Sequence, residues 1–258
     1  MHFPLPLSPV TIIELPPRWA LPLIFAIGLL GVLTIMLQPL RLFMKRKNFA
    51  GLGNKAFASL FFCIAGVVAA GMRDFINWQA AIMLLSFCLA AIGDVLLAMG
   101  PVLKEPRKDQ PFIFAVGGAS FAAAHILTFV ALLSFVPFDD FDWRTFGIAL
   151  FLPLIYIAFW IRGKLKLGRN GGPIVFYALI LSALLWAAIH TLAVDQTLGL
   201  FTIAVAVLYI ISDTALFFSN FGSDKAKKKL RSGKSFLFLV MLPYYLAQAL
   251  LACALLVI

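Results

Sequence analysis

The chain has 258 residues, of which 63% are hydrophobic and 12% are charged, and its formal net charge is +10. A soluble domain carries about 25% charged residues, so this composition excludes an ordinary globular protein and indicates an integral membrane protein. The long runs are continuously apolar and lack the alternation of a membrane β-barrel. We therefore expect an all-α membrane protein.

Eight transmembrane helices are expected in chain order, because eight apolar runs approach the roughly 20 residues that a helix needs to cross a bilayer. They cover approximately residues 21–43, 54–71, 78–99, 112–135, 144–161, 173–191, 197–221 and 236–258. No linker, low-complexity tract or soluble segment separates these runs. Residues 1–258 are therefore expected to form a single integral membrane domain.

The basic residues are confined to alternate loops. All of the 21 Lys and Arg residues except Arg18, Arg73 and Arg144 follow the first, third, fifth or seventh span. Such an excess marks cytoplasmic loops, so both termini are expected on the non-cytoplasmic side of a bacterial inner membrane, a plasma membrane or an endoplasmic reticulum membrane. The run Lys225–Arg231 is interpreted as a topology signal with a secondary attraction to anionic lipids. The positive charge therefore needs no nucleic-acid partner, and the sequence gives no oligomeric state.

Three ionisable residues fall inside the apolar runs: Asp94 in the third span, His125 in the fourth and Asp213 in the seventh. A charged side chain at the bilayer centre costs about 2.5–3.5 kcal/mol on insertion scales, so such residues usually face an interior site. At a rise of about 1.5 Å per residue, the two acids lie roughly 8 and 12 Å from the cytoplasmic ends of their spans. Two acids at similar depth on different helices indicate a functional pair, while hydrogen bonding between helices is the structural alternative.

Other polar residues reach a similar level of the bilayer. His125 follows Gly117 and Phe121 on one helical face, and Lys55 opens the second span at the interface. The eighth span brings in Tyr244 and Tyr245, with Gln248 one turn deeper; these three are either site residues or polar contacts between helices.

The sequence gives little support for a metal site and contains none of the familiar hydrolase motifs. Catalytic zinc usually takes three protein ligands, often histidines, and only one histidine lies at membrane depth. The three cysteines all fall inside apolar runs, which favours neither a disulfide framework nor a Cys-rich metal site. No Gly-x-Ser-x-Gly nucleophile motif or phosphate-binding glycine loop is present. We therefore expect no metal and no cofactor.

The chain resembles the YhhN family of membrane proteins, which includes the lysoplasmalogenases. The resemblance covers the second to the eighth span and is carried by four motifs, with Lys55 and Tyr177 at further similar positions. The motifs are Gly93-Asp94 with Leu96-Leu97, Phe114-x-x-Gly117-x-x-x-Phe121-x-x-x-His125, Ser212-Asp213-x-x-Leu216 and Pro243-Tyr244-Tyr245-x-x-Gln248. Ala56 and Thr128 depart from the family, which commonly has Pro and Tyr there.

The resemblance implies hydrolysis of the vinyl-ether bond of a lysoplasmalogen, giving a fatty aldehyde and a glycerophospho-alcohol. This reaction delivers a proton to carbon, stabilises an oxocarbenium-like cation and adds water, which suits one protonated and one ionised carboxyl group. Asp94 and Asp213 are the candidate pair, with His125 orienting water or moving protons. The expected ligand is a lysophospholipid or ether lipid, bound by Lys55 at the phosphate and by other polar residues: Tyr177, Ser212, Tyr244, Tyr245 and Gln248.

Two other functions use the same residues. A transporter coupled to protons or cations would use the buried acids as ion sites, although no inverted repeat is evident between the two halves. A non-catalytic lipid-binding bundle would use the acids only to join its helices.

Overall fold

The computed structural model describes residues 17–37, 49–72, 77–99, 106–137 and 142–258. Within these residues the chain forms helices and no strands, and eight of its helical segments are long and apolar enough to cross a membrane. The helices are α1 (Ala20–Leu37), α3 (Phe49–Gly71), α4 (Trp78–Met99), α5 (Pro106–Leu133), α6 (Gly147–Ile161), α7 (Gly171–Val194), α8 (Gln196–Phe221), α9 (Asp224–Leu230), α10 (Gly233–Phe236) and α11 (Leu242–Val257). The protein is therefore an integral, multi-pass helical membrane protein, as its composition predicts.

The predicted spans correspond to these helices, and the boundaries differ at several ends. Two helices begin earlier than expected: α3 at Phe49 instead of residue 54, and α5 at Pro106 instead of residue 112. Proline is well tolerated in the first helical turn and Lys and Arg are good helix formers, so part of the expected basic turn before α5 is helical. The end of the first predicted span, residues 38–43, lies outside the described residues.

The eighth predicted span is not one regular helix. It consists of α10, a π-helical turn at Leu237–Met241, and α11. Pro243 begins the next segment without a backbone N–H, so the carbonyl four residues earlier loses its α-helical partner. The wider π-helical turn accommodates the missing α-helical hydrogen bond. It also sets the direction, around the helix axis, in which the tyrosines that follow project.

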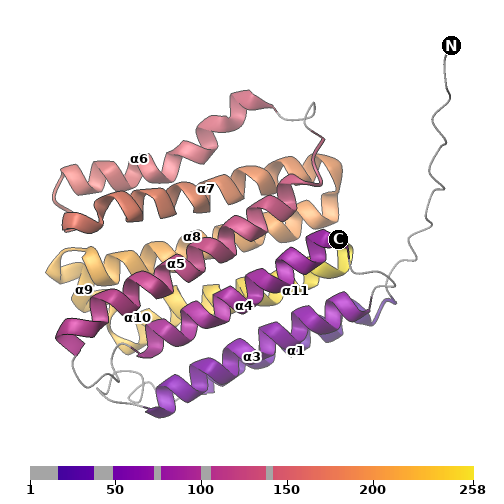
Figure 1. Cartoon of the computed structure of the whole chain (residues 1–258), viewed down its shortest axis with the longest axis horizontal. Helices are drawn as coiled ribbons and strands as arrows, with labels where there is room; N and C mark the ends of the chain where they lie inside the picture. Colours follow the sequence, from indigo (N-terminus) through magenta and orange to yellow (C-terminus); the bar gives the residue numbers. More distant parts are fainter. Residues whose placement is uncertain (1–16, 38–48, 73–76, 100–105, 138–141) are drawn as a thin grey trace.

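The last helix, α11, is the most enclosed element of the bundle. It packs against α1, α3 and α8, while α6 lies outermost against α7 (Figure 1). A helix that is apolar all round is typical of a buried position. A Cβ atom added at Gly28 of α1 would lie 2.5 Å from the Cβ of Ala249, so small residues allow these two helices to touch.

A second close contact explains the two glycines of the motifs in α4 and α5. A Cβ at Gly93 would lie 3.0 Å from the ring of Phe121 and 3.1 Å from the carbonyl oxygen of Gly117, and a Cβ at Gly117 would meet Leu97. The glycines therefore let α4 and α5 pack backbone to backbone. This contact sets the two helices that carry Asp94 and His125 side by side.

The turn between α6 and α7 is tied to the end of α8. Gly163 ends α6 with φ at 66°, a conformation that favours glycine, and the backbone N–H of Lys166 donates to the carbonyl of Phe221 at 2.6 Å. The same end of the bundle holds α9 and α10, at the left of Figure 1, with the basic residues from Lys225 to Lys234. That this basic end faces the cytoplasm stays a prediction.

Candidate functional site

The two buried acids line one cavity at the basic end of the bundle. The cavity has a volume of about 290 Å³ and is bordered by α3, α4, α5, α8 and the segment from α9 to α11. Asp94 and Asp213 both lie on its wall, and apolar side chains such as Phe121 and Met241 form much of the rest. The structure thus brings the predicted pair to a common space without a direct contact between them in any hydrogen bond or ion pair of the described residues.

Asp94 is held by side chains from two other helices. Lys55 Nζ lies 2.9 Å from its Oδ1 atom, the Ser59 hydroxyl donates to Oδ2 at 2.7 Å, and the Tyr245 hydroxyl donates to Oδ2 as well. Lys55 and Ser59 are four residues apart and share one face of α3. Asp94 is 3% exposed and Lys55 is 8% exposed, so the ion pair is buried. These contacts join α3, α4 and α11 around one carboxylate.

Asp213 has a different environment on α8. Its Oδ2 atom accepts a hydrogen bond of 2.7 Å from the hydroxyl of Tyr177 on α7. The Nε2 atom of His125 lies 3.4 Å from the same oxygen, which is ion-pair distance but lacks hydrogen-bond geometry. The imidazole packs on the ring of Tyr209, with ring centres 4.5 Å apart. His125 is buried behind Asp213 and is not among the residues that line the cavity.

Aromatic rings separate the two acid clusters. Tyr244 lines the cavity and makes edge contacts with Phe121 and Tyr245, with ring centres 5.6 and 5.0 Å apart. It also lies near Tyr209, beside His125. All five tyrosines of the chain are buried, and four of them surround the two acids. The site is therefore a pocket with aromatic and aliphatic walls that also contains two carboxyl groups, two cationic side chains and several hydroxyl and amide groups.

The remaining predicted site residues take different places. Ser212 lines the cavity, and its hydroxyl donates to the carbonyl of Val240 in the π-helical turn at 2.9 Å. Tyr177 contacts Asp213 but lines a separate groove. Gln248 is buried outside the cavity lining, and its Oε1 atom has no hydrogen-bond partner among the described residues. Lys55 lines the cavity in its ion pair with Asp94, and its phosphate role stays a prediction.

Three residues of the cavity lining were not anticipated: Ser219, Asn220 and Arg231. Ser219 is buried, and Arg231 is exposed and so marks the mouth of the cavity. The guanidinium group of Arg231 donates from Nε to the carbonyl of Ser219 at 2.9 Å and from Nη2 to Oδ1 of Asn220 at 3.2 Å. In the sequence Arg231 belongs to the run interpreted as a topology signal. Arg231 reaches the cavity because the short α9 segment folds back onto the end of α8, and no local sequence pattern predicts that turn.

Metal binding can be assessed from the same geometry. In the described part of the chain, no three side chains of His, Cys, Asp or Glu come close enough to form a metal site.

Comparison with known proteins supports the resemblance seen in the motifs. The model of the YhhN family matches residues 52–255, which run from the beginning of α3 to near the end of α11. No curated protein and no solved structure gives a significant match to the chain. The matched region contains both acid clusters and the whole cavity. The chain belongs to the YhhN family.

Proposed function

We propose that this protein is a membrane-embedded hydrolase that cleaves the vinyl-ether bond of a lysoplasmalogen. One observation carries the proposal: two buried carboxyl groups with different polar partners line one small cavity. Membership of the YhhN family is consistent with this activity. The substrate is a single-chain ether phospholipid, and the products are a fatty aldehyde and a glycerophospho-alcohol.

The reaction proceeds by acid–base chemistry in three steps. A carboxylic acid donates its proton to the outer carbon of the vinyl ether, the one not bonded to oxygen. This leaves a cation shared between the inner carbon, which is bonded to oxygen, and the ether oxygen. Water adds to the inner carbon and gives up a proton, forming a hemiacetal. The hemiacetal loses its hydroxyl proton while the leaving oxygen gains one, and the C–O bond breaks to give aldehyde and alcohol. General acid–base catalysis of this kind is typically worth about 10²–10⁴ in rate per group.

The contacts favour Asp213 as the proton donor and Asp94 as the fixed carboxylate. Asp94 is in an ion pair with Lys55 and accepts two further hydroxyl donors, so it is suited to stabilising the cation and not to giving a proton. Among the described residues Asp213 has one hydroxyl donor, from Tyr177 to Oδ2, and its side chain borders the cavity. After the first step Asp213 is a carboxylate and accepts the proton from water.

The surrounding side chains position the two acids and stabilise the cation and the phosphate. His125 acts through Asp213, because it contacts that acid without lining the cavity. The rings of Tyr244 and Phe121 border the cavity, and a developing cation over the face of either ring would be stabilised. Ser212 and Tyr245 hold the cavity wall and Asp94, respectively. The phosphate is bound at the mouth by Arg231, with Lys55 as a second cation on the wall.

Aldehyde release by the purified protein in detergent tests the function. An alk-1-enyl lysophospholipid should release its aldehyde in proportion to enzyme, whereas the saturated alkyl-ether analogue should release none, since it cannot form the stabilised cation. A transporter or a non-catalytic lipid-binding bundle would give no aldehyde from either lipid. Absence of aldehyde from a monodisperse protein that still binds the alkyl analogue would refute hydrolysis.

A further inference from the structure

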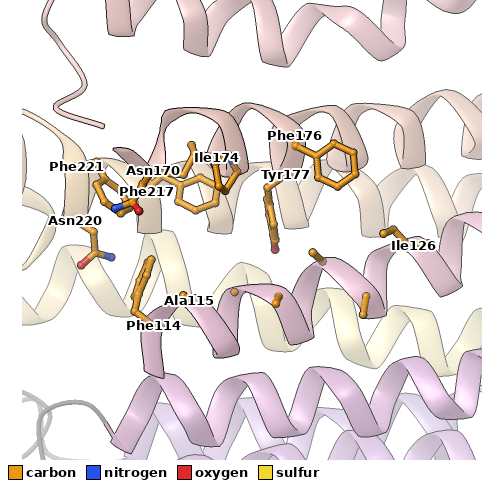
Figure 2. Close-up of a pocket in the computed structure, with 15 residues that line it drawn as sticks. Phe114, Ala115, Ile126, Asn170, Ile174, Phe176, Tyr177, Phe217, Asn220 and Phe221 are labelled. Carbon is orange, nitrogen blue, oxygen red and sulfur yellow. The ribbon is translucent and has the colours of Figure 1, made fainter. Parts of the chain in front are cut away.

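A second and larger hollow lies between α5, α7 and α8. Its volume is about 730 Å³, within the roughly 300–1,000 Å³ of typical ligand sites, and its lining is mainly apolar. Figure 2 shows Tyr177 projecting from α7 toward α5, with Asn170 and Asn220 near one end of the groove and Phe176 and Ile126 near the other. Phe176 is 58% exposed, so the outer edge of the groove faces the hydrocarbon of the bilayer.

One wall of this groove is a line of small residues on α5. Gly118, Ala119, Ala122 and Ala123 lie on one face of the helix, and Ile126 follows one turn further on. From residue 115 to residue 126 the wall extends about 16 Å at a rise of about 1.5 Å per residue. A Cβ atom at Gly118 would meet no atom within 4 Å, so the space beside this wall is open.

The groove adjoins the cavity of the acids. Phe114 and Asn220 line both hollows. Tyr177 lines the groove with its ring, while its hydroxyl donates to Asp213, which lines the cavity. A molecule in the groove therefore contacts Tyr177, the residue whose hydroxyl is hydrogen-bonded to the proposed proton donor.

The polarity along this path matches an amphiphile. The apolar stretch lies beside Phe176 and Ile126, and the polar atoms of Asn170 and Asn220 lie toward the basic end of the bundle. Asn220 is in turn bonded to Arg231, and no carboxylate of the described residues forms an ion pair with that guanidinium group. A hydrocarbon chain with a phosphate at one end fits this order of surfaces.

We propose that the groove between α5 and α7 binds the hydrocarbon chain of the substrate, which enters sideways from the bilayer. The proposal rests on the proposed function for its choice of a single-chain ether phospholipid. A chain that moves from lipid into an apolar groove gains little hydrophobic free energy, because both surroundings are hydrocarbon. The groove therefore positions the vinyl ether relative to Asp213 and selects for chain length. It contributes little free energy of binding, and its effect is expected in kcat/KM.

Gly118→Leu tests the groove with little risk to folding. The added side chain enters open space, and replacing a glycine inside a helix raises helix propensity. Gly53→Leu on α3 is the matched control, because a Cβ there also meets nothing within 4 Å and the residue lies outside both hollows. On a long-chain substrate, kcat/KM should fall about tenfold or more in Gly118→Leu and stay near wild type in Gly53→Leu. Equal values for the two variants would overturn the proposal.

Photo-cross-linking provides a readout that does not depend on catalysis. The probe is a saturated 1-O-alkyl lysophosphatidylcholine with a diazirine at the chain end, bound to the wild-type protein in detergent. Adducts should concentrate on residues 118–126 and 173–177 and decrease in Gly118→Leu. Adducts spread over the outer faces of α1 and α6 would overturn the groove proposal even if aldehyde is released. Adducts in the groove without aldehyde release would support the groove and refute hydrolysis.

Discussion

Lys55 and Asp94 form a buried ion pair, with Nζ and Oδ1 2.9 Å apart, between the first turns of α3 and the last turns of α4. Two charges removed from water cost several kcal/mol each, and their attraction offsets this cost only when the geometry is good and the other lone pairs are satisfied. Ser59 and Tyr245 supply those further hydrogen bonds to the carboxylate. The pair is thus both a structural joint and part of the cavity wall.

Removing the lysine alone should destabilise the fold strongly. Lys55→Met leaves Asp94 buried without its countercharge, a change that typically costs about 3–5 kcal/mol. Adding Asp94→Asn should recover most of that loss, because the amide carries no charge and still accepts hydrogen bonds. Thermal unfolding in detergent measures both variants.

The exposed pair Lys166–Asp224, 3.5 Å apart, provides the control. Lys166→Met should change stability by about 1 kcal/mol or less, because exposed ion pairs are screened by water. Equal destabilisation by the single Lys55→Met and the double variant would show that the ion pair does not carry the effect.

The hydroxyl of Tyr177 should matter for rate more than for stability. Tyr177→Phe removes the hydrogen bond that fixes Asp213, so kcat should fall about tenfold to a hundredfold while the fold is kept. Tyr156→Phe is the matched control, because that hydroxyl donates to Thr214 at 2.9 Å and not to an acid. Each change removes one buried hydrogen bond, worth about 0.5–1.5 kcal/mol. Similar kcat values in the two variants would remove Tyr177 from the site.

The contact between α4 and α5 should not tolerate a side chain. Gly93→Ala places a methyl group against Phe121 and the carbonyl of Gly117, and such overpacking typically costs about 1–3 kcal/mol. Gly53→Ala, where the added carbon meets nothing within 4 Å, should be neutral or slightly stabilising. Unfolding temperatures of the two alanine variants measure the difference. An unchanged temperature for Gly93→Ala would mean that the helices can separate freely.

Arg231 should act on substrate binding. Arg231→Gln removes the cation at the mouth of the cavity, so the apparent KM for lysophospholipid should rise more than kcat falls. Lys228→Gln, in the same basic run but outside the cavity lining, should leave both constants near wild type. Steady-state kinetics on phospholipid vesicles distinguishes the two variants. Parallel increases in KM would assign the effect to general attraction of the basic run to the membrane.

The sequence was sufficient for the spans and for the face of α5 that carries the histidine. Apolar runs and the spacing of Gly117, Phe121 and His125 are local patterns, and the helix period alone converts them into positions. Hydrogen bonds between residues of different helices cannot be predicted from such local patterns. Tyr245 is 151 residues from Asp94, and Tyr177 is 36 residues from Asp213, so pairing them requires the order in which the helices pack. Helix periodicity fixes which face a residue occupies and not which neighbouring helix that face meets.

Arg231 shows the same limit at the surface. In the sequence it is one of several cations in a short run, and the positive-inside rule accounts for all of them together. Its hydrogen bonds to Ser219 and Asn220 depend on the turn that folds α9 back onto α8. The different environments of Asp94 and Asp213 could not be predicted from the sequence either, because the depth of a residue along a span does not identify its hydrogen-bond partners.

Turnover of the Asp94→Asn and Asp213→Asn proteins tests the central claim most directly. The substitution keeps the size of the side chain and much of its hydrogen bonding while it removes proton transfer and charge. Monodisperse Asp213→Asn should lose about 10²–10⁴ in kcat for aldehyde release through lost proton transfer, and Asp94→Asn about 10²–10³ through lost stabilisation of the cation. The double variant should be little worse than the worse single one, since residues that act as a unit are non-additive. Activity within a few-fold of wild type in both single variants would contradict the account.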